Sequence, residues 1–386
     1  MSPADDEDDR AGLARLLAGV GRAAGLDEVG FAGAEPFDDV RRTLEARRGR
    51  GLSGGMAFTY RNPARSTDPS RALPGARSLV VGARSYLRRD PQESGDAGAD
   101  VPTRHAAGAV ARYSWEDHYA PLRRGLEAVA GELEQRGWRA RVLVDDNALV
   151  DRAAAHRAGL GWWGKNTNLL LPGRGSWFVL GSVVTDAPLP AEPAPAADQC
   201  GACTRCLTAC PTGALVEPGV LDARRCLAWL LEAPGPFPRE HRVALGGRIY
   251  GCDDCQEVCP PNRAAERREP PPPAPPGAEP WVDLVDLLAT PDDELLRRLG
   301  RWYIPRREAR YLRRNALIAL GNVGDPGSAA VRRAVETALV SNDAIVRGHA
   351  VWAARRLGLD DLVDDLAATE TDAYVLEEVG AAVPRR

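Results

Sequence analysis

Short apolar runs alternate with amphipathic segments along the first half of the chain. Residues 12–25 place leucine and valine mostly three or four positions apart, which predicts a helix, and residues 119–136 show the same period. Apolar runs at 78–82, 140–144 and 177–184 predict buried strands. Strands that alternate with helices in this way predict an α/β domain through about residue 190.

The second half of the chain is patterned differently. LRRNALIAL begins at Leu312 and VRGHAVWAA begins at Val346, and each copy carries Arg second and Ala fifth, 34 residues apart. A repeat of this length predicts a pair of helical hairpins of the HEAT type. A generic helical bundle is the alternative, because it can show the same coincidence by chance.

Two proline-rich stretches separate these regions. DAPLPAEPAPAAD (186–198) reads as a connector, and EPPPPAPPGAEP (269–280) reads as a stiff, extended linker. The predicted division is a disordered acidic tail at 1–10, the α/β domain at 11–190, a cysteine-rich domain at 191–268, the linker at 269–280 and a helical domain at 281–386.

The composition adds limits on location and partners. The 386 residues are 44% hydrophobic and 27% charged, as in ordinary soluble proteins, and the net charge of −4 gives no general bias toward nucleic acid. No apolar run approaches the roughly 18 residues of a membrane span. MSPADDEDDR is acidic where a secretory signal is basic and then apolar. We therefore expect a cytoplasmic monomer that does not associate with membranes.

All eight cysteines lie in one short window. The first run is Cys200-x2-Cys203-x2-Cys206-x3-Cys210-Pro, the second is Cys252-x2-Cys255-x3-Cys259-Pro, and Cys226 stands between them. Cytosolic thiols are kept reduced, so a disulfide framework is not expected. The runs have the form of bacterial ferredoxins, in which the fourth cysteine binds the other cluster.

This rule sorts the cysteines into two four-thiolate sets. The predicted ligands of one 4Fe–4S cluster are Cys200, Cys203, Cys206 and Cys259, and those of the other are Cys210, Cys226, Cys252 and Cys255. Zinc is the competing metal, because two four-thiolate zinc sites would also use eight cysteines. Zinc sites usually show paired CxxC knuckles, whereas this chain has a triple run that ends in Cys-Pro.

The motifs together resemble the epoxyqueuosine reductase family, which performs the last step of queuosine biosynthesis in tRNA. The resemblance rests on CGACTRCLTACPTGAL, LDARRC and GGRIYGCDDCQEVCPPN within residues 199–262. It extends over nearly the whole chain through GLGWWGKNTNLLL (159–171), GSWFVLGSVVTD (175–186) and ARYLRRNALIALGN (309–322).

The resemblance implies a fold and a reaction. The implied fold is an α/β cobalamin-binding domain, a ferredoxin-like module with two 4Fe–4S clusters and a HEAT-like C-terminal domain. The implied reaction is a two-electron reduction that removes the epoxide oxygen, with electrons from a low-potential donor passing through the clusters to cobalamin. The Asp-x-His-x-x-Gly loop, by which many corrinoid proteins supply a histidine to cobalt, is absent from the sequence. The family is likewise expected to bind cobalamin without a histidine ligand.

The resemblance also points to site residues. The family's catalytic aspartate lies in a motif like VDxxPxxER, which aligns with residues 144–152 and gives Asp145 the role of proton donor. On the residues alone, an aspartate at a strand end more often caps the next helix. The implied cobalamin pocket is Arg61, Arg112, Tyr113, Asp145, Lys165, Asn166, Thr167 and Ser176.

The sequence departs from the family pattern at several positions. Ala148 replaces the motif's proline and Asp151 its glutamate, Asp117-His118-Tyr119 replaces Asp-Tyr-His, and LAWLLEAPGPFP follows Cys226. These departures leave two alternatives open: a related corrinoid reductase with another substrate, as in reductive dehalogenases, and a non-catalytic electron-transfer protein.

Arginines gather before the first helical repeat. RWYIPRREARYLRRN (301–315) carries six arginines and one glutamate. Arg306, Arg310, Arg313 and Arg314 recur largely at helical spacing, which predicts one face that binds tRNA phosphates. Trp302, Tyr303 and Tyr311 lie among them and are predicted to stack on bases. A solvated face in an arginine-rich chain is the alternative.

Overall fold

The computed structural model describes residues 3–191 and 195–385, apart from 91–105. The chain forms two compact units, and each is assembled from three separate segments. Unit 1 comprises residues 1–88, 117–224 and 254–272, and unit 2 comprises residues 89–116, 225–253 and 273–386.

A four-stranded sheet forms the centre of unit 1. Its order is β1 (Glu28–Gly33), β2 (Ser78–Ser85), β7 (Phe178–Thr185), β4 (Ala140–Val144). Every neighbouring pair is antiparallel. Strands and helices alternate along the chain as predicted, but the sheet has none of the parallel pairing that is common in alternating folds.

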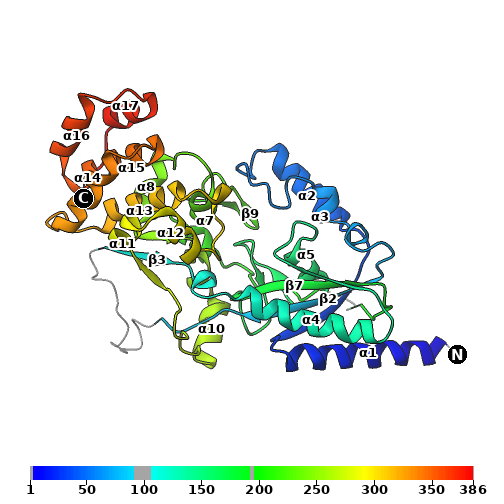
Figure 1. Ribbon diagram of the computed structural model, residues 1–386. Coiled ribbons are helices and arrows are strands. Elements are labelled where there is room, and N and C mark those ends of the chain that lie inside the picture. The colour runs from blue at the N-terminus through cyan, green and yellow to red at the C-terminus, as the bar shows by residue number, and fades with distance from the viewer. Residues whose placement is uncertain (1–2, 91–105, 192–194, 386) are drawn as a thin grey trace. The chain divides into compact units, whose positions relative to one another are not determined.

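Helices cover both faces of this sheet (Figure 1). α1 (Pro3–Ala23) and α4 (Tyr119–Gln135) pack side by side on one face, and α5 (Asp151–Arg157) packs on the other. On β2, Leu79, Val81 and Ala83 face the core that includes the alanines of α5. Val80, between them, is equally buried. Burial on both faces explains why this strand is a continuous apolar run.

The remaining elements of unit 1 are short. They are α2 (Asp38–Gly49), α3 (Pro63–Ser66), η1 (Pro69–Arg71), β5 (Trp162–Trp163), β6 (Leu169–Leu170), α6 (Arg205–Ala209), β8 (Leu215–Glu217), β9 (Val220–Leu221), α9 (Asp254–Glu257) and α10 (Pro260–Arg268).

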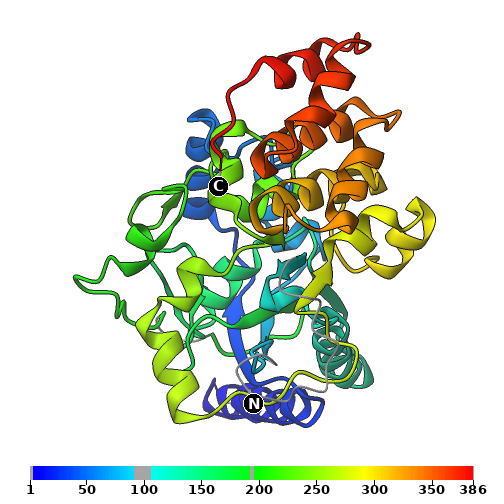
Figure 2. The same cartoon turned by 90° about the vertical axis from the view of Figure 1, so that its left-hand side faces the viewer.

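Unit 2 combines a three-stranded sheet with a helical array. The sheet order is β10 (Arg248–Tyr250), β3 (Ala107–Val110), β11 (Trp281–Asp283). Figure 2 shows α13 to α17 following one another from orange to red. The helices and helical turns are η2 (Arg112–Ser114), α7 (Leu227–Glu232), α8 (Arg239–Leu245), α11 (Leu284–Ala289), α12 (Asp292–Arg298), η3 (Pro305–Arg307), α13 (Arg310–Val323), α14 (Ala329–Leu339), α15 (Ala344–Leu357), α16 (Asp360–Ala367) and α17 (Ala373–Gly380).

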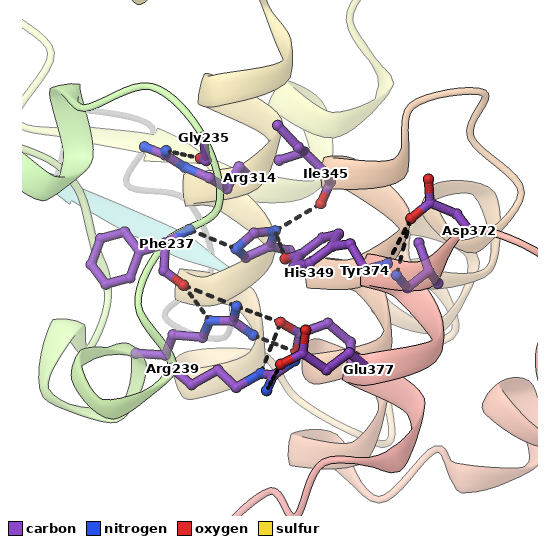
Figure 3. Close-up of polar contacts among 12 residues, drawn as sticks. Gly235, Phe237, Arg239, Arg314, Ile345, His349, Asp372, Tyr374 and Glu377 are labelled. Carbon is purple, nitrogen blue, oxygen red and sulfur yellow. Dashed lines mark hydrogen bonds and ion pairs between the residues drawn. The ribbon is translucent and has the colours of Figure 1, made fainter.

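A buried polar network lies among α8, α15 and α17 in unit 2 (Figure 3). Arg242 and Glu378, both 1% exposed, form an ion pair at 2.8 Å. His349 Nε2 accepts a hydrogen bond from the Phe237 amide at 3.2 Å, and His349 Nδ1 donates to the Ile345 carbonyl at 2.7 Å. Each of these buried polar groups is therefore satisfied within the unit.

Several sequence predictions can be judged against the elements. The strands at 78–82, 140–144 and 177–184 are confirmed as β2, β4 and β7, and the helix at 119–136 is confirmed as α4. The two repeat copies fall on α13 and α15, which pack against each other.

Other predictions need correction. The tail at 1–10 is not disordered, because α1 begins at Pro3, although residues 1–2 lie outside the described part. The stretch 269–280 stays a predicted stiff, extended linker, and within it the Glu279 amide donates to the Trp115 carbonyl at 2.8 Å. The observed units also cut across the predicted domains at 11–190 and 191–268. Among the described residues, no helix has the length and apolarity to cross a membrane.

Candidate functional site

The loop that follows β4 carries the predicted acid. Val144 ends the strand, Asp145 adopts a φ of 51°, and α5 begins at Asp151. We call residues 144–150 the Asp145 loop. The Asp146 side chain closes it by accepting the Ala148 amide at 2.8 Å. A positive φ at a residue other than glycine costs about 1–3 kcal/mol, so the surrounding contacts must hold Asp145 in this conformation.

Contacts from distant segments of unit 1 hold the Asp145 loop. The Asn147 side chain accepts the Thr59 amide at 2.9 Å, and the Asn147 carbonyl accepts the Ser66 hydroxyl at 2.6 Å. Thr59 is itself at a φ of 55°. Arg61, two residues later, is exposed and belongs to the segment that braces the loop. A second strained residue therefore braces the loop at Asn147, two positions after the predicted acid.

The electrostatics of the loop favour a protonated carboxyl. Partial burial of its carboxyl raises the pKa of Asp145, and the Asp146 charge raises it further. The residue as a whole still meets solvent. The combination suits an acid, since protein atoms disfavour the charged form while a substrate can reach the group.

The turn of residues 164–167, the GKNT turn, joins this region to the cysteine loops of unit 1. Lys165 Nζ donates to the Gly201 carbonyl at 2.5 Å, and Asn166 Nδ2 donates to the Cys255 carbonyl at 3.2 Å. The Thr167 carbonyl accepts from Arg152 at 3.2 Å. Lys165, Asn166 and Thr167 thus connect α5, the helix that follows the Asp145 loop, to both cysteine runs.

Ser176 belongs to a buried hydrogen-bonded cluster. Its amide donates to Asn262 Oδ1 at 2.6 Å, and its hydroxyl accepts from Gln256 at 3.1 Å and from Asn262 at 3.0 Å. A Cβ at Gly175, where φ is 76°, would lie 2.0 Å from Asn262. The Gly-Ser pair therefore fits closely against the segment that follows Cys259.

The eight cysteines are free thiols, and each is half-buried. Burial raises the pKa of Cys259 to about 11, and the charges of three further cysteines, Cys200, Cys206 and Cys203, raise it too. All four cysteines assigned to the first cluster belong to unit 1. Thiols with raised pKa values ionise at neutral pH only when a metal centre stabilises the thiolate, so this donor set fits an iron–sulfur cluster.

The second set is divided between the units. Cys210 and Cys255 belong to unit 1, and Cys226 and Cys252 belong to unit 2. Within unit 1, Cys210 Sγ accepts the Ala214 amide at 3.2 Å. Such N–H···S bonds stabilise a reduced cluster and raise its potential.

Arg112 and Tyr113 lie in unit 2. The Arg112 amide donates to Asp253 Oδ2 at 2.7 Å, directly after Cys252. The Tyr113 hydroxyl donates to Glu232 at 2.9 Å. Burial, followed by the Glu232 charge, holds the pKa of Tyr113 well above its usual value. Their role in binding a cofactor stays a prediction.

The prediction of one phosphate-binding arginine face is wrong. Arg314 is fully buried and donates to the carbonyls of Leu230, Leu231, Ala233 and Gly235. Arg313 donates to Thr290 and pairs with Asp292, and Arg310 pairs with Asp343 at 2.8 Å. The spacing was helical, but it buried Arg314 in unit 2 and directed Arg310 and Arg313 to carboxylates of the same unit.

The aromatic residues of segment 301–315 are likewise partly buried and partly exposed. Trp302 and Tyr311 are 2% and 4% exposed, so the prediction that they stack on bases is wrong. Tyr303 is 58% exposed, and Arg306 is exposed with a φ of 51°. These two residues remain available to a nucleic acid.

Several site residues were not singled out from the sequence. Thr59, Asn147 and Gln256 gave no signal, because only the fold brings them to the loop or to Ser176. Asp151 was noted as a family departure and given no role, and its position directly after the loop was the available signal.

The family comparisons cover two segments of the chain. Residues 199–262 match the 4Fe-4S double cluster binding domain. Residues 66–146 match the family described as epoxyqueuosine reductase QueG, DUF1730, and this match includes Asp145. The prediction of two 4Fe–4S clusters in the cysteine-rich segment is confirmed by the first match.

Relatives resemble the chain over almost its whole length. The epoxyqueuosine reductase of Xanthomonas campestris pv. campestris is 36% identical over 360 residues, covering 92% of this chain and 98% of the relative. A crystal structure of epoxyqueuosine reductase with an epoxyqueuosine-modified tRNA-Tyr stem loop has a TM-score of 0.84 at 30% identity, covering 96% of this chain and 97% of that one.

A further structure, of the Bacillus subtilis epoxyqueuosine reductase, has its catalytic aspartate loop swung out of the active site. It matches with the same TM-score of 0.84 at 30% identity, covering 96% of this chain and 97% of that one.

Proposed function

The chain belongs to the epoxyqueuosine reductase family and is an oxidoreductase that reduces epoxyqueuosine in tRNA to queuosine, and we propose that it does so with cobalamin and with Asp145 as the acid. The overall change adds two electrons and two protons to the epoxide and releases its oxygen as water. The alternatives of another substrate and of a non-catalytic electron carrier are not favoured by the relatives.

The residues of unit 1 fit cobalamin by their chemistry. The corrin ring carries amide arms, which need hydrogen-bond donors and acceptors around them. Exposed Arg61, two residues from the Thr59 contact to the loop, and the GKNT turn, bound to Arg152 of α5, supply such groups. Bound cobalamin would supply two-electron chemistry at its cobalt, and the two clusters would supply the electrons from a low-potential donor.

Asp145 carries the acid step in this proposal. Its carboxyl meets solvent, and partial burial raises its pKa, so the protonated form persists to higher pH than in an ordinary aspartate. The proton goes to the epoxide oxygen as its bond to carbon breaks. The Bacillus subtilis enzyme, in which an aspartate loop swings out of the active site, supports a loop that can move.

Lys165 and Asn166 hold the GKNT turn in place. Their side chains are engaged by Gly201 and Cys255, so they fix the GKNT turn against both cysteine runs. Fixed geometry limits the distance that an electron must travel between the clusters and the cofactor. We assign these two residues to positioning, and we assign the backbone of the turn to cofactor contact.

Unit 2 would present the tRNA-binding surface. We infer that α13 to α16 form two HEAT-like hairpins, because the two matching motifs lie on α13 and α15 and these helices pack together. Exposed Arg306 would contact phosphate and exposed Tyr303 would stack on a base. We further propose that the enzyme works as a cytoplasmic monomer.

The observation that carries the proposal is the strained, solvent-accessible loop that places a carboxyl of raised pKa at Asp145. The test is a turnover assay with anaerobically reconstituted protein, cobalamin, a reductant and tRNA that contains epoxyqueuosine. Mass spectrometry of the nucleosides should show queuosine. If the protein binds cobalamin and reduces other compounds but forms no queuosine, the proposed substrate is wrong. If cobalamin does not co-elute in gel filtration, the proposed cofactor is wrong.

A further inference from the structure

One residue attaches the Asp145 loop to a distant part of unit 1. The side-chain oxygen of Asn147, at the centre of the loop, accepts the Thr59 amide at 2.9 Å. The Asn147 carbonyl accepts the Ser66 hydroxyl at 2.6 Å. Between Asp145 and Leu149, these are the two hydrogen bonds that reach other segments of the described chain. Asn147 is therefore the point at which hydrogen bonds fix the loop to the rest of the unit.

The segment that donates these bonds is itself well anchored. Ser66 is 2% exposed, so water does not compete for its hydroxyl. The next residue, Thr67, is equally buried, and its hydroxyl donates to the Pro63 carbonyl at 2.7 Å. The Thr67 carbonyl accepts the Phe37 amide at 2.7 Å, which joins the segment to the start of α2. A loop bonded to this segment is thus held at a defined place in unit 1.

The bonds inside the loop do not fix Asp145. The Asp146 side chain accepts the Ala148 amide at 2.8 Å, and the Asp146 carbonyl accepts the Leu149 amide at 3.4 Å. Neither bond includes Asp145, whose φ of 51° is uncommon for a residue with a side chain. A strained residue relaxes when the contacts around it are lost, so the attachment at Asn147 decides where the Asp145 carboxyl lies.

We propose that Asn147 is a positioning residue that acts through Asp145. This inference rests on the proposed role of Asp145 as the acid. The two hydrogen bonds of Asn147 hold the loop in the conformation from which the carboxyl reaches the epoxide oxygen. Without them the loop relaxes to conformations that cannot deliver the proton. Asn147 carries no proton itself, and it sets the fraction of molecules in which the acid is in place.

The first test is the single-turnover rate of queuosine formation by the anaerobically reconstituted protein. Asn147→Ala removes the acceptor of the Thr59 amide, and we expect the rate to fall about tenfold, as for the loss of one hydrogen bond. Asn147→Asp keeps an acceptor oxygen in the same place, and its charge favours the protonated form of Asp145, so its rate should stay within about threefold of wild type. A wild-type rate in Asn147→Ala overturns the proposal.

The second hydrogen bond gives an independent variant. Ser66→Ala removes the donor to the Asn147 carbonyl and leaves Asn147 in place, and we expect a rate about fivefold below wild type. Thr43→Ala is the matched control, because it removes an exposed hydroxyl of α2 that donates to the Asp39 carbonyl at 2.9 Å. Its rate should equal that of wild type. If Asn147→Ala does not fold, equal rates in Ser66→Ala and Thr43→Ala overturn the proposal.

Hydrogen exchange tests the attachment without turnover. Peptides that cover residues 56–67 and 144–150 should exchange about tenfold faster in Asn147→Ala than in wild type, because the Thr59 amide loses its acceptor. Peptides of β2 and β7 should exchange equally in the two proteins. Unchanged exchange of the loop peptide overturns the proposal. Faster exchange throughout unit 1 would show a general loss of stability and overturns it as well.

A double variant separates positioning from a structural role. If Asn147 acts through Asp145, Asn147→Ala slows the wild type and leaves the rate of Asp145→Asn unchanged. Equal slowing in both backgrounds overturns the proposal. If Asp145→Asn turns over like wild type, the proposed role of Asp145 fails, and this inference fails with it. If Asp145→Asn is slow and Asn147→Ala is not, only the positioning role fails.

Discussion

The Asp145 loop of unit 1 and the buried polar network of unit 2 both surround charged groups with protein atoms, and they treat them in opposite ways. In the network, Arg242 is paired with Glu378, and both ring nitrogens of His349 are engaged. At the loop, Asp145 and Asp151, the first residue of α5, act on each other through like charge, and the buried Oδ1 atom of Asp151 has no hydrogen-bond partner within the described residues.

The difference distinguishes polar groups that stabilise the fold from polar groups that are left able to react. A satisfied buried network fixes one arrangement, and its groups have no remaining capacity to bind a substrate. A strained backbone beside an unsatisfied carboxyl oxygen is unstable by itself, and arrangements of this kind gather at functional sites. Substitutions in the loop should therefore reduce turnover and spare stability, and substitutions in the network should do the reverse.

The largest expected effect is on turnover. Asp145→Asn should lower the single-turnover rate by about 10²–10⁴-fold, because the amide cannot deliver a proton. Iron content and the thermal midpoint should match wild type. A variant that keeps turnover within threefold of wild type, or that loses its clusters, would show that Asp145 is a structural residue.

The next effect is on stability. Glu378→Ala should destabilise unit 2 by about 3–5 kcal/mol, because it leaves the Arg242 guanidinium buried without its counter-charge. Hydrogen exchange of α8 and α17 measures this locally. Glu377→Ala is the matched control, since the Glu377 side chain is 68% exposed and its pair with Arg239 is on the surface. Equal protection in the two variants would contradict the prediction.

A smaller effect concerns pH. Burial holds the pKa of His349 well below its usual value, so the folded state keeps this side chain neutral while the unfolded state binds a proton. The contribution of neutral His349 to the free energy of unfolding is therefore fully present above about pH 6.5, the pKa of an unfolded histidine. It falls as the pH drops below this value, by up to about 1.4 kcal/mol per pH unit. His349→Gln should remove this dependence from a series of denaturant titrations between pH 7.5 and 5. An unchanged slope would exclude His349 as its source.

The smallest effect is on tRNA affinity. Arg306→Ala should weaken binding a few-fold and lower the salt slope of log Kd by about 1, because Arg306 is exposed and would contact a phosphate. Filter binding at several salt concentrations measures both. Arg297→Ala, an exposed arginine at the end of α12, serves as the control. If the two variants lose affinity equally, the loss comes from the lower net positive charge and not from a phosphate contact of Arg306.

Local patterns in the sequence predicted most of unit 1. Apolar runs placed β2, β4 and β7 because these strands turn apolar side chains to the core, and cysteine spacing located the segment that matches a 4Fe-4S double cluster domain. The arrangement of Arg313 and Arg314 could not be predicted in this way. Helical spacing identifies a shared face but does not say whether that face meets solvent or a neighbouring segment.

A site residue could be predicted only where a single sequence motif contained it. Asp145 was proposed from the family resemblance alone, because its position at a strand end more often marks a helix cap. Its strained φ, the brace from Thr59 and Ser66, and the coupling to Asp151 depend on contacts between segments distant in the chain. Such contacts leave no periodic trace in the sequence.

The interleaving of the two units has a consequence for biosynthesis. The last segment of unit 1 ends at residue 272, and the last segment of unit 2 runs to residue 386. A nascent chain therefore cannot complete unit 1 until about two thirds of it has been translated, with the middle segment of unit 2 already made. No single cut can yield either unit whole, so truncation from either end should give insoluble products. Delivery of iron and sulfide must accordingly wait until late in translation.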